Sequence, residues 1–294
     1  MDLKVEIFDS VIKQIVPEDI NVEQVATGFG FTEGPVWCGD YLLFSDLRGN
    51  RITRWRMLSE GPEVTTFRSP SGNSNGLTLD KSGRLIACEH STRRLTRTEL
   101  DGSITVLADR YQGKRLNSPN DVVVRTDGSV YFTDPPYGLI GLTAWKELPF
   151  NGVYRLSPDG ELVLVVDDFD RPNGLAFSPD ETVLYVNDTT RRHIRIFDVN
   201  TSGSLSNGRV LIDMQSPELG SPDGMKVDQE GNIYCTGPGG FWIIEPSGKC
   251  LARIIPPELP ANLAWGNSDW RTLYITARTS VYRMRLTIPG IPVF

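Results

Sequence analysis

One short phrase recurs six times along this chain and constrains its fold more than any other feature. Each copy joins an oxygen-bearing side chain to a short apolar run, and a turn rich in Gly, Asp, Ser or Asn follows. We call the oxygen-bearing residue the anchor; the six anchors are Glu33, Asn75, Asn120, Asn173, Asp223 and Asn262. Their spacings of 42, 45, 53, 50 and 39 residues leave room for several short strands per copy. Such a period is typical of propeller blades rather than of helical solenoids.

The repeat predicts an all-β, six-bladed β-propeller, with residues 1–294 as one domain. A blade has four strands, but only three strand-like runs remain from Asn262 onward: NLAWG, TLYITA and SVYRMRL. The segment before Glu33 belongs to no complete repeat. We therefore expect the stretch around VEQVATG to return and supply the outer strand of the last blade, because that closure removes an open sheet edge.

Composition excludes several classes of protein. The net charge of −7, without a long Lys/Arg run, argues against a nucleic-acid partner. The chain has no apolar stretch of the length that spans a membrane, and its N-terminus lacks the apolar core of a signal peptide. Four scattered cysteines without a CxxC pair favour reduced thiols and a cytoplasmic location, although their even number leaves a disulfide open. The oligomeric state is left undetermined.

The anchors predict a metal site. Corresponding positions of successive blades point to the same place relative to the propeller axis, so six anchors would form a ring at one mouth of the central channel. Carboxylate and amide oxygens are the ligands of a hard divalent cation, which calcium binds at about 2.3–2.6 Å. A single Asn-Gly step is usually only a turn, but the turn of most copies is already supplied downstream, by phrases such as DKSG, SPDE and DQEG. With only His90 and His193 in the chain, and neither near a Cys at ligand spacing, a His/Cys zinc site is disfavoured.

Several phrases together resemble the SMP-30/gluconolactonase (regucalcin-like) family. They are FTEGPVW, RLNSPNDVVV with YFTDPPYG, RPNGLAFSPDE, SPDGMKVD and TGPGGFWI, and the similarity extends from about residue 20 to residue 286. The resemblance implies a six-bladed propeller with one divalent cation on its axis. It also implies a lactonase, that is, a hydrolase that opens a small-molecule sugar lactone.

The resemblance also implies roles for individual residues. Glu33, Asn173 and Asp223 match metal ligands of the family, and Asn120 matches a residue at the metal or its bound substrate. Some members carry a substrate-binding Arg two residues before that Asn. In this chain the nearest arginine is Arg115, five residues away, and we expect it to reach the substrate.

The cation expected is calcium, with magnesium, manganese or zinc as alternatives. It would polarise the lactone carbonyl, and Asp223 is the expected base for the attacking water. His90, which follows the strand RLIAC, is the alternative base and an expected substrate contact. We see no GxSxG elbow and no nucleophile–His–Asp set, which disfavours covalent catalysis.

Two other functions stay open from the sequence. The same scaffold and cation could hydrolyse a different lactone, an ester or a phosphotriester, or the propeller could be a metal-binding protein without enzymatic activity. Residues 134–150, DPPYGLIGLTAWKELPF, are too long for a hairpin turn and predict a lid or pocket wall in blade three.

Overall fold

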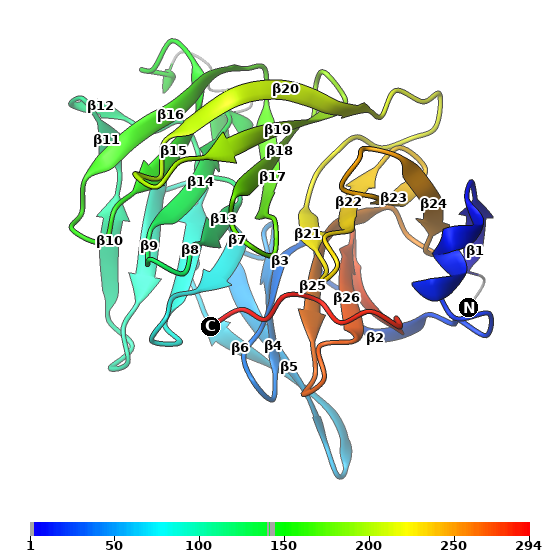
Figure 1. Cartoon of the computed structure of the whole chain (residues 1–294). Helices are drawn as coiled ribbons and strands as arrows, with labels where there is room; N and C mark the ends of the chain where they lie inside the picture. Colours follow the sequence, from blue (N-terminus) through cyan, green and yellow to red (C-terminus); the bar gives the residue numbers. More distant parts are fainter. Residues whose placement is uncertain (1–2, 140, 142–144) are drawn as a thin grey trace.

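The computed structural model, which describes residues 3–139, 141 and 145–294, confirms a six-bladed β-propeller. Six antiparallel sheets surround a central axis, and the chain passes through them in order from blue to red (Figure 1). Within the described residues no α-helix is found, and only two 3-10 turns occur, η1 (Ser10–Gln14) and η2 (Tyr137–Leu139). The alternating and continuous apolar runs of the sequence therefore form strands, as predicted.

In each blade the strands follow one another outward from the axis, so that the first strand of the repeat is innermost. Blade one contains β3 (Thr32–Trp37), β4 (Leu42–Asp46), β5 (Arg51–Leu58) and β6 (Gly61–Arg68). Blade two contains β7 (Ser74–Leu79), β8 (Leu85–Glu89), β9 (Arg94–Thr98) and β10 (Ile104–Ala108). Blade three contains β13 (Val122–Val124), β14 (Val130–Asp134), β15 (Asn151–Leu156) and β16 (Leu162–Phe169). A small hairpin of β11 (Arg110–Tyr111) and β12 (Lys114–Arg115) precedes blade three.

The second half of the chain repeats this arrangement. Blade four contains β17 (Pro172–Phe177), β18 (Val183–Asp188), β19 (His193–Val199) and β20 (Leu205–Asp213). Blade five contains β21 (Met225–Val227), β22 (Ile233–Gly237), β23 (Gly240–Ile244) and β24 (Cys250–Ile255). The last blade contains β25 (Pro260–Gly266), β26 (Thr272–Ala277) and β27 (Ser280–Arg285).

The N-terminal segment closes the propeller, as the sequence predicts. Its strand β2 (Glu23–Thr27) pairs antiparallel with β27, with Gln24 opposite Tyr282, and becomes the outer strand of the last blade. A second N-terminal strand, β1 (Lys4–Ile7), pairs with β24 and gives blade five a fifth strand that we did not predict. The two ends of the chain are therefore held in neighbouring blades.

The apolar core lies between neighbouring blades. The two inner strands of a blade are almost wholly buried, as in β3 and β4, whereas the outer strand β6 alternates between half-buried and exposed residues. Aromatic rings join blades to one another: Trp37 of blade one stacks on Tyr274 of the last blade, with ring centroids 5.3 Å apart. Packing of this kind fixes the angle between blades and hence the position of every innermost strand.

All six anchors lie at the start of an innermost strand, four of them within its first residues and Asn120 and Asp223 just before it. In four blades the next residue is glycine because the neighbouring blade leaves no room for a side chain. A Cβ on Gly34 would lie 2.0 Å from the carbonyl oxygen of Asn75, and one on Gly174 would lie 2.2 Å from that of Asp223. The Asn-Gly steps are therefore blade contacts rather than turns.

All four cysteines are free thiols, as we expected, and two of them, Cys88 and Cys235, are fully buried. Among the residues described, no helix has the length and apolar character needed to cross a lipid bilayer.

We predict that deletion of residues 1–30 destabilises the protein severely. The deletion removes β2, exposes the edge of β27 and uncovers core positions filled by Ile12, Ile15 and Val22. We expect insoluble protein or a melting temperature lowered by more than about 10 °C, measured by circular dichroism. Deletion of residues 1–8 is the control: it removes only β1 and should cost much less. Equal melting of the 1–30 deletion and the full chain would show that β2 does not close the fold.

Candidate functional site

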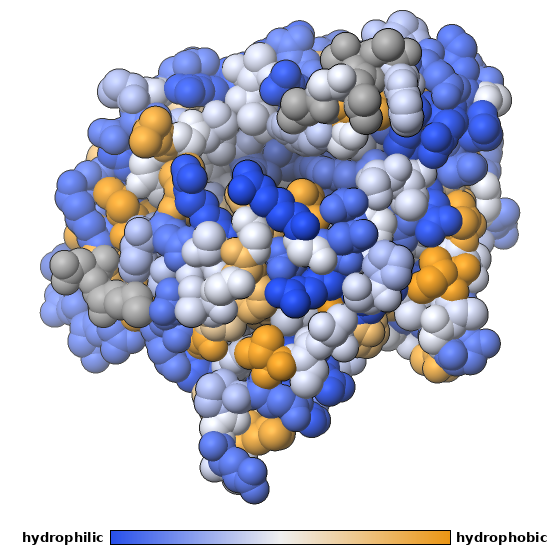
Figure 2. All heavy atoms as spheres, turned by 180° about the vertical axis from the view of Figure 1, so that it is seen from behind, coloured by the Kyte–Doolittle hydropathy of each residue, from blue (hydrophilic) through white to orange (hydrophobic). Residues whose placement is uncertain are grey.

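A polar cavity of about 440 Å³ opens at one mouth of the central channel. This face points away from the viewer in Figure 1; seen from behind, it is hollowed near its centre, with mostly hydrophilic residues around the hollow (Figure 2). Residues of several blades and of the connecting loops line the cavity: Phe31, Glu33, Leu47, Arg48, Asn75, His90, Asn120, Tyr137, Asn173, Thr189, Gly220, Ser221, Pro222, Asp223, Leu259, Pro260, Ala261 and Arg278.

Five of the six anchors lie in this lining, so the structure brings together the residues predicted from the repeat: Glu33, Asn75, Asn120, Asn173 and Asp223. The sixth, Asn262, is not part of the lining. It is buried next to Glu33, and its Nδ2 donates to Glu33 Oε2 over 3.0 Å. Asn262 therefore holds the carboxylate of Glu33 in place by a hydrogen bond.

The amide side chains of the cavity form one hydrogen-bonded series. Asn75 Nδ2 donates to Asn120 Oδ1 over 3.1 Å, and Asn120 Nδ2 donates to Asn173 Oδ1 over 2.6 Å. Asn173 Nδ2 donates to Thr189 Oγ1 over 3.0 Å, and this hydroxyl donates in turn to the carbonyl of Pro222. Because each amide is held by its neighbour, the side-chain oxygens of Asn120 and Asn173 are fixed before any ligand binds.

Three carboxylates lie at the axis: Glu33 and Asp121 are buried, and Asp223 is partly buried. Burial, together with the nearby charge of Asp121, raises the pKa of Glu33 to about 7. Burial and the charge of Glu33 raise the pKa of Asp223 well above its usual range. Burial also raises the pKa of Asp121, although the ammonium of Lys226 opposes this shift. Like charges removed from water are costly unless a cation compensates them, so this cluster is suited to a cation.

His90 lies in the cavity wall beside Asn120. Its Nε2 is 3.1 Å from Asn120 Oδ1, and its side chain is buried. Burial lowers the pKa of His90 to about 4, so the imidazole is neutral at pH 7. A neutral imidazole can hydrogen-bond a substrate hydroxyl, but it is a weaker base than a carboxylate whose pKa is raised.

Arg115 does not line the cavity. Its guanidinium donates to the carbonyl of Thr92 over 2.8 Å, and its backbone N–H donates to Glu147 Oε2. The hairpin of β11 and β12 thus turns this side chain toward the loop after β8. The structure does not bring Arg115 together with the other predicted site residues.

The insertion at 134–150 contributes to the cavity through Tyr137, whose hydroxyl accepts a hydrogen bond from Asn173 Nδ2 over 3.4 Å. The insertion is held to the blade by Ser118, whose hydroxyl donates to Pro135 and accepts from the N–H of Gly138. Part of the predicted lid or wall, residues 140 and 142–144, lies outside the described residues. Within the described part of the insertion, Tyr137 is the residue that lines the cavity.

The donors fit a hard divalent cation. Among the described residues no three His, Cys, Asp or Glu side chains gather closely enough to hold a metal ion by themselves, so asparagine oxygens would have to contribute. Glu33 receives hydrogen bonds from Gly34 and Asn262 on Oε2 alone, and no described residue donates to Oε1. Two carboxylates and two carboxamides offer only oxygen atoms, as calcium and magnesium prefer.

Sequence reasoning missed three polar residues around the anchors: Asp121, Thr189 and Lys226. Asp121 follows an anchor where four other blades have glycine, and this departure from the repeat is a signal that could have identified it. Lys226 stands three residues after an anchor, where the other blades carry Val, Thr, Ala or Trp, so it too is a departure from the repeat. Thr189 follows the second strand of blade four at the position that His90 holds in blade two.

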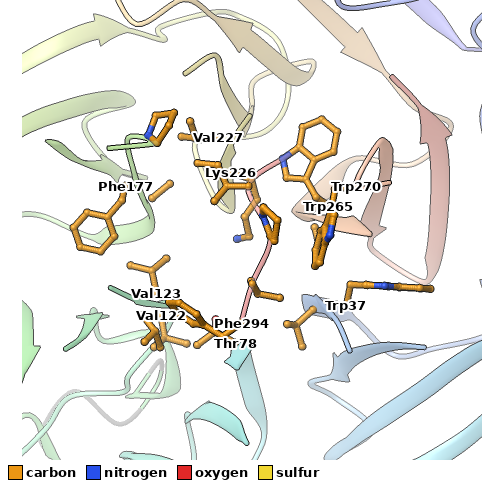
Figure 3. A pocket seen from close by; sticks show the side chains of 18 of the residues that line it. Trp37, Thr78, Val122, Val123, Phe177, Lys226, Val227, Trp265, Trp270 and Phe294 are labelled. Atoms are coloured by element: carbon orange, nitrogen blue, oxygen red, sulfur yellow. The ribbon is translucent and has the colours of Figure 1, made fainter. Parts of the chain in front are cut away.

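The other mouth of the channel holds a second, apolar cavity of about 200 Å³. It is lined from the far ends of the innermost strands, by residues such as Trp37, Phe177 and Trp265, and by the C-terminal residues 291–294 (Figure 3). Lys226 lies among these side chains, and its Nζ is 3.4 Å from Asn262 Oδ1. Apart from Lys226 and Glu181, no ionisable side chain lines this cavity in the described part of the chain, so the polar cavity is the candidate active site.

Comparisons with known proteins identify the family of this chain. Residues 31–279 match the family described as SMP-30/Gluconolactonase/LRE-like region. A gluconolactonase from Zymomonas mobilis is 36% identical over 96% of this chain and 86% of its own length. The solved structure of a gluconolactonase from Xanthomonas campestris is 35% identical and superimposes with a TM-score of 0.88, covering 96% of this chain and 94% of that one. Regucalcin from Agrobacterium tumefaciens, a calcium-binding protein that is 17% identical, shares the fold, with a TM-score of 0.78 over 93% of this chain and 96% of that one.

We predict that Lys226→Met lowers the free energy of unfolding of the metal-free protein at pH 7. The substitution removes the one ammonium that offsets Glu33 and Asp121. We expect a loss of about 1–3 kcal/mol in urea denaturation, less than for a fully buried ion pair because Lys226 is partly exposed. Lys81→Met removes an exposed lysine and serves as the control. Equal loss in both variants would contradict a role of Lys226 in charge compensation.

Proposed function

Because the chain belongs to the SMP-30/gluconolactonase/LRE-like family, we propose that it is a lactonase that opens a sugar lactone with water in the polar cavity. The observation that carries this proposal is the ring of anchor oxygens, found in a cavity of substrate size in a chain that is 36% identical to a gluconolactonase. The catalytic cation is held by Glu33, Asn120, Asn173 and Asp223.

Calcium is the expected cation, with magnesium, manganese or zinc as alternatives. The donor set supports this order, because it contains only oxygen atoms. A relative of the same fold is described as calcium-binding, which also points to a divalent cation. When bound, the cation supplies Lewis-acid polarisation of the lactone carbonyl.

The protein's own residues position the reactants. The amide series from Asn75 to Thr189 fixes the carboxamides of Asn120 and Asn173, which orient the substrate because amides do not exchange protons at neutral pH. His90 and Asn120 lie side by side and are suited to hydrogen-bond the sugar hydroxyls. Tyr137 and Phe31 offer aromatic surface to the sugar ring.

Asp223 is the proposed base. Its carboxylate lines the cavity and keeps part of its surface accessible, whereas Glu33 is 2% exposed and tied to Gly34 and Asn262. Glu33 therefore mainly holds the cation, and Asp223 takes the proton of the attacking water. His90 is the alternative base, and its low pKa makes it the weaker one.

We predict that chelation abolishes hydrolysis. Treatment with EDTA followed by dialysis should remove turnover of glucono-1,5-lactone, and calcium, manganese or magnesium should restore it, because the carboxylates alone lack a Lewis acid. Rates would be followed by proton release at constant pH. Full activity in protein shown by elemental analysis to be free of metal would contradict a catalytic cation.

We predict that Asp223→Asn lowers kcat by about 10²–10⁴-fold, the usual cost of losing a general base. The amide keeps the size and one ligand oxygen but cannot accept the proton of water. The loss should persist when metal is saturating, since occupancy of the site does not restore a base. Steady-state kinetics at several calcium concentrations measure this.

Two further variants distinguish metal binding from proton transfer. Asn120→Asp adds a negative charge, so it should tighten metal binding while disturbing substrate orientation. Recovery of normal kcat in Asp223→Asn by additional metal would make Asp223 a ligand only. His90→Ala would then be expected to show the large loss in kcat.

A further inference from the structure

Two arginines from neighbouring blades lie at the mouth of the polar cavity. Arg48 is in the turn between β4 and β5 of blade one, and Arg278 is in the hairpin turn between β26 and β27 of the last blade. Both line the cavity, and both are exposed. The proposed mechanism uses neither of them.

Backbone hydrogen bonds fix these two turns beside the strand that carries Glu33. The N–H of Thr32 donates to the carbonyl of Arg278 over 2.7 Å, and the N–H of Leu47 donates to the carbonyl of Phe31 over 2.9 Å. The guanidinium of Arg48 lies over the Phe31 ring, 5.9 Å from its centroid. The two turns therefore flank residues 31–32 on either side, directly above the start of β3.

Carboxylates close to the two turns are occupied by other partners. Asp46 accepts from the N–H groups of Gly30 and Gly49 and pairs with Arg51. Glu258 accepts from Thr279, Ser280 and Tyr282. Among the described residues, no side-chain hydrogen bond or ion pair involves either guanidinium of Arg48 or Arg278.

Arg48 and Arg278 differ from the other arginines of blades one and two in this respect. The chain carries a net charge of −7, and most of its arginines at positions 51–97 form ion pairs with Asp or Glu. Two unpaired guanidinium groups at the opening of a cavity form a site for an anion, because their planar forks match the oxygens of phosphate or carboxylate.

We propose that the lactone substrate carries a second, negatively charged group, a phosphate or a carboxylate, at the end remote from the lactone carbonyl, and that Arg48 and Arg278 bind this group. The inference rests on the proposed function, because it assigns the reactive end of the lactone to the anchors. With that end at Glu33 and Asp223, the opposite end of a sugar-sized molecule reaches the mouth of the cavity. The enzyme thus prefers anionic sugar lactones to neutral ones.

Binding of three open-chain sugar acids by titration calorimetry tests this inference without requiring turnover. Gluconate has no second charge, glucarate has a carboxylate on the terminal carbon, and 6-phosphogluconate has a phosphate there. We expect one or both doubly charged acids to bind about 10–100-fold more tightly than gluconate to the calcium-loaded protein. Whichever of glucarate and 6-phosphogluconate binds more tightly identifies the anion. The ratio of its affinity to that of gluconate should fall as salt is added.

In the double variant Arg48→Gln/Arg278→Gln, the affinity for the anionic acid should exceed the affinity for gluconate by no more than about threefold. Arg271→Gln is the matched control: it removes an exposed arginine next to Trp270, which lines the apolar cavity at the other mouth, and should keep the full advantage. Equal binding of all three acids to the unmodified protein would overturn the inference, and so would an advantage that survives in the double variant.

Kinetics distinguish this failure from a failure of the proposed function. Hydrolysis of glucono-1,5-lactone, of its 6-phosphate and of a lactone of glucarate at equal rates would leave the lactonase intact and overturn only the preference. Hydrolysis of none of these lactones would overturn the lactonase, while the calorimetric comparison still decides whether the mouth binds anions.

Discussion

The close approach of neighbouring blades at the axis is the constraint on which the site depends. A glycine follows four of the anchors because the backbone of the next blade occupies the space of a side chain. The N–H of Gly174, for example, donates to the carbonyl of Asp223 over 3.1 Å, and the N–H of Gly76 donates to that of Asn120 over 2.8 Å. These close backbone contacts and the ring of anchor oxygens therefore belong to the same part of the fold, so the site cannot loosen without loosening the propeller.

Two blades depart from this pattern, and both departures change the chemistry of the axis. Blade three has Asp121 and the last blade has Leu263 in place of the glycine. Asp121 brings a third carboxylate to the axis, where its Oδ2 lies 3.5 Å from Asn262 Nδ2. Asn262 donates to Glu33 and Asp121 and accepts from Lys226 on its oxygen, while the ammonium of Lys226 attracts both carboxylates directly. The repeat places the ring of anchor oxygens, and the two blades that depart from it determine the charge around that ring.

The sequence predicted what the period determines: the six blades, the closing strand β2 and the positions of the anchors. It could not predict contributions from irregular segments. Tyr137 and Arg48 come from an insertion and a turn whose paths depend on tertiary contacts. Thr189 and Arg278 instead directly follow the second strand of their blades, at the repeat position that His90 holds in blade two, and our sequence reasoning overlooked them. Arg115 illustrates the same limit, because its place in the sequence near Asn120 did not reveal that the β11–β12 hairpin turns it toward Thr92. Proximity along the chain predicts proximity in space only where the backbone repeats.

The direction of the innermost strands gives the channel two different ends. Strand β3 runs from Glu33 in the polar cavity to Trp37 in the apolar one, and the other innermost strands run the same way. The C-terminal tail then crosses the apolar end, where the N–H of Gly290 donates to the carbonyl of Trp270 (Figure 1). Apolar side chains and the tail line this end, so its chemistry matches a polar substrate less well than the anchor side does. Of the carboxylates at the axis, Glu33 and Asp121 are buried and Asp223 stays partly exposed in the polar cavity. Removal from water strengthens the attraction of such carboxylates for a cation that arrives through the mouth.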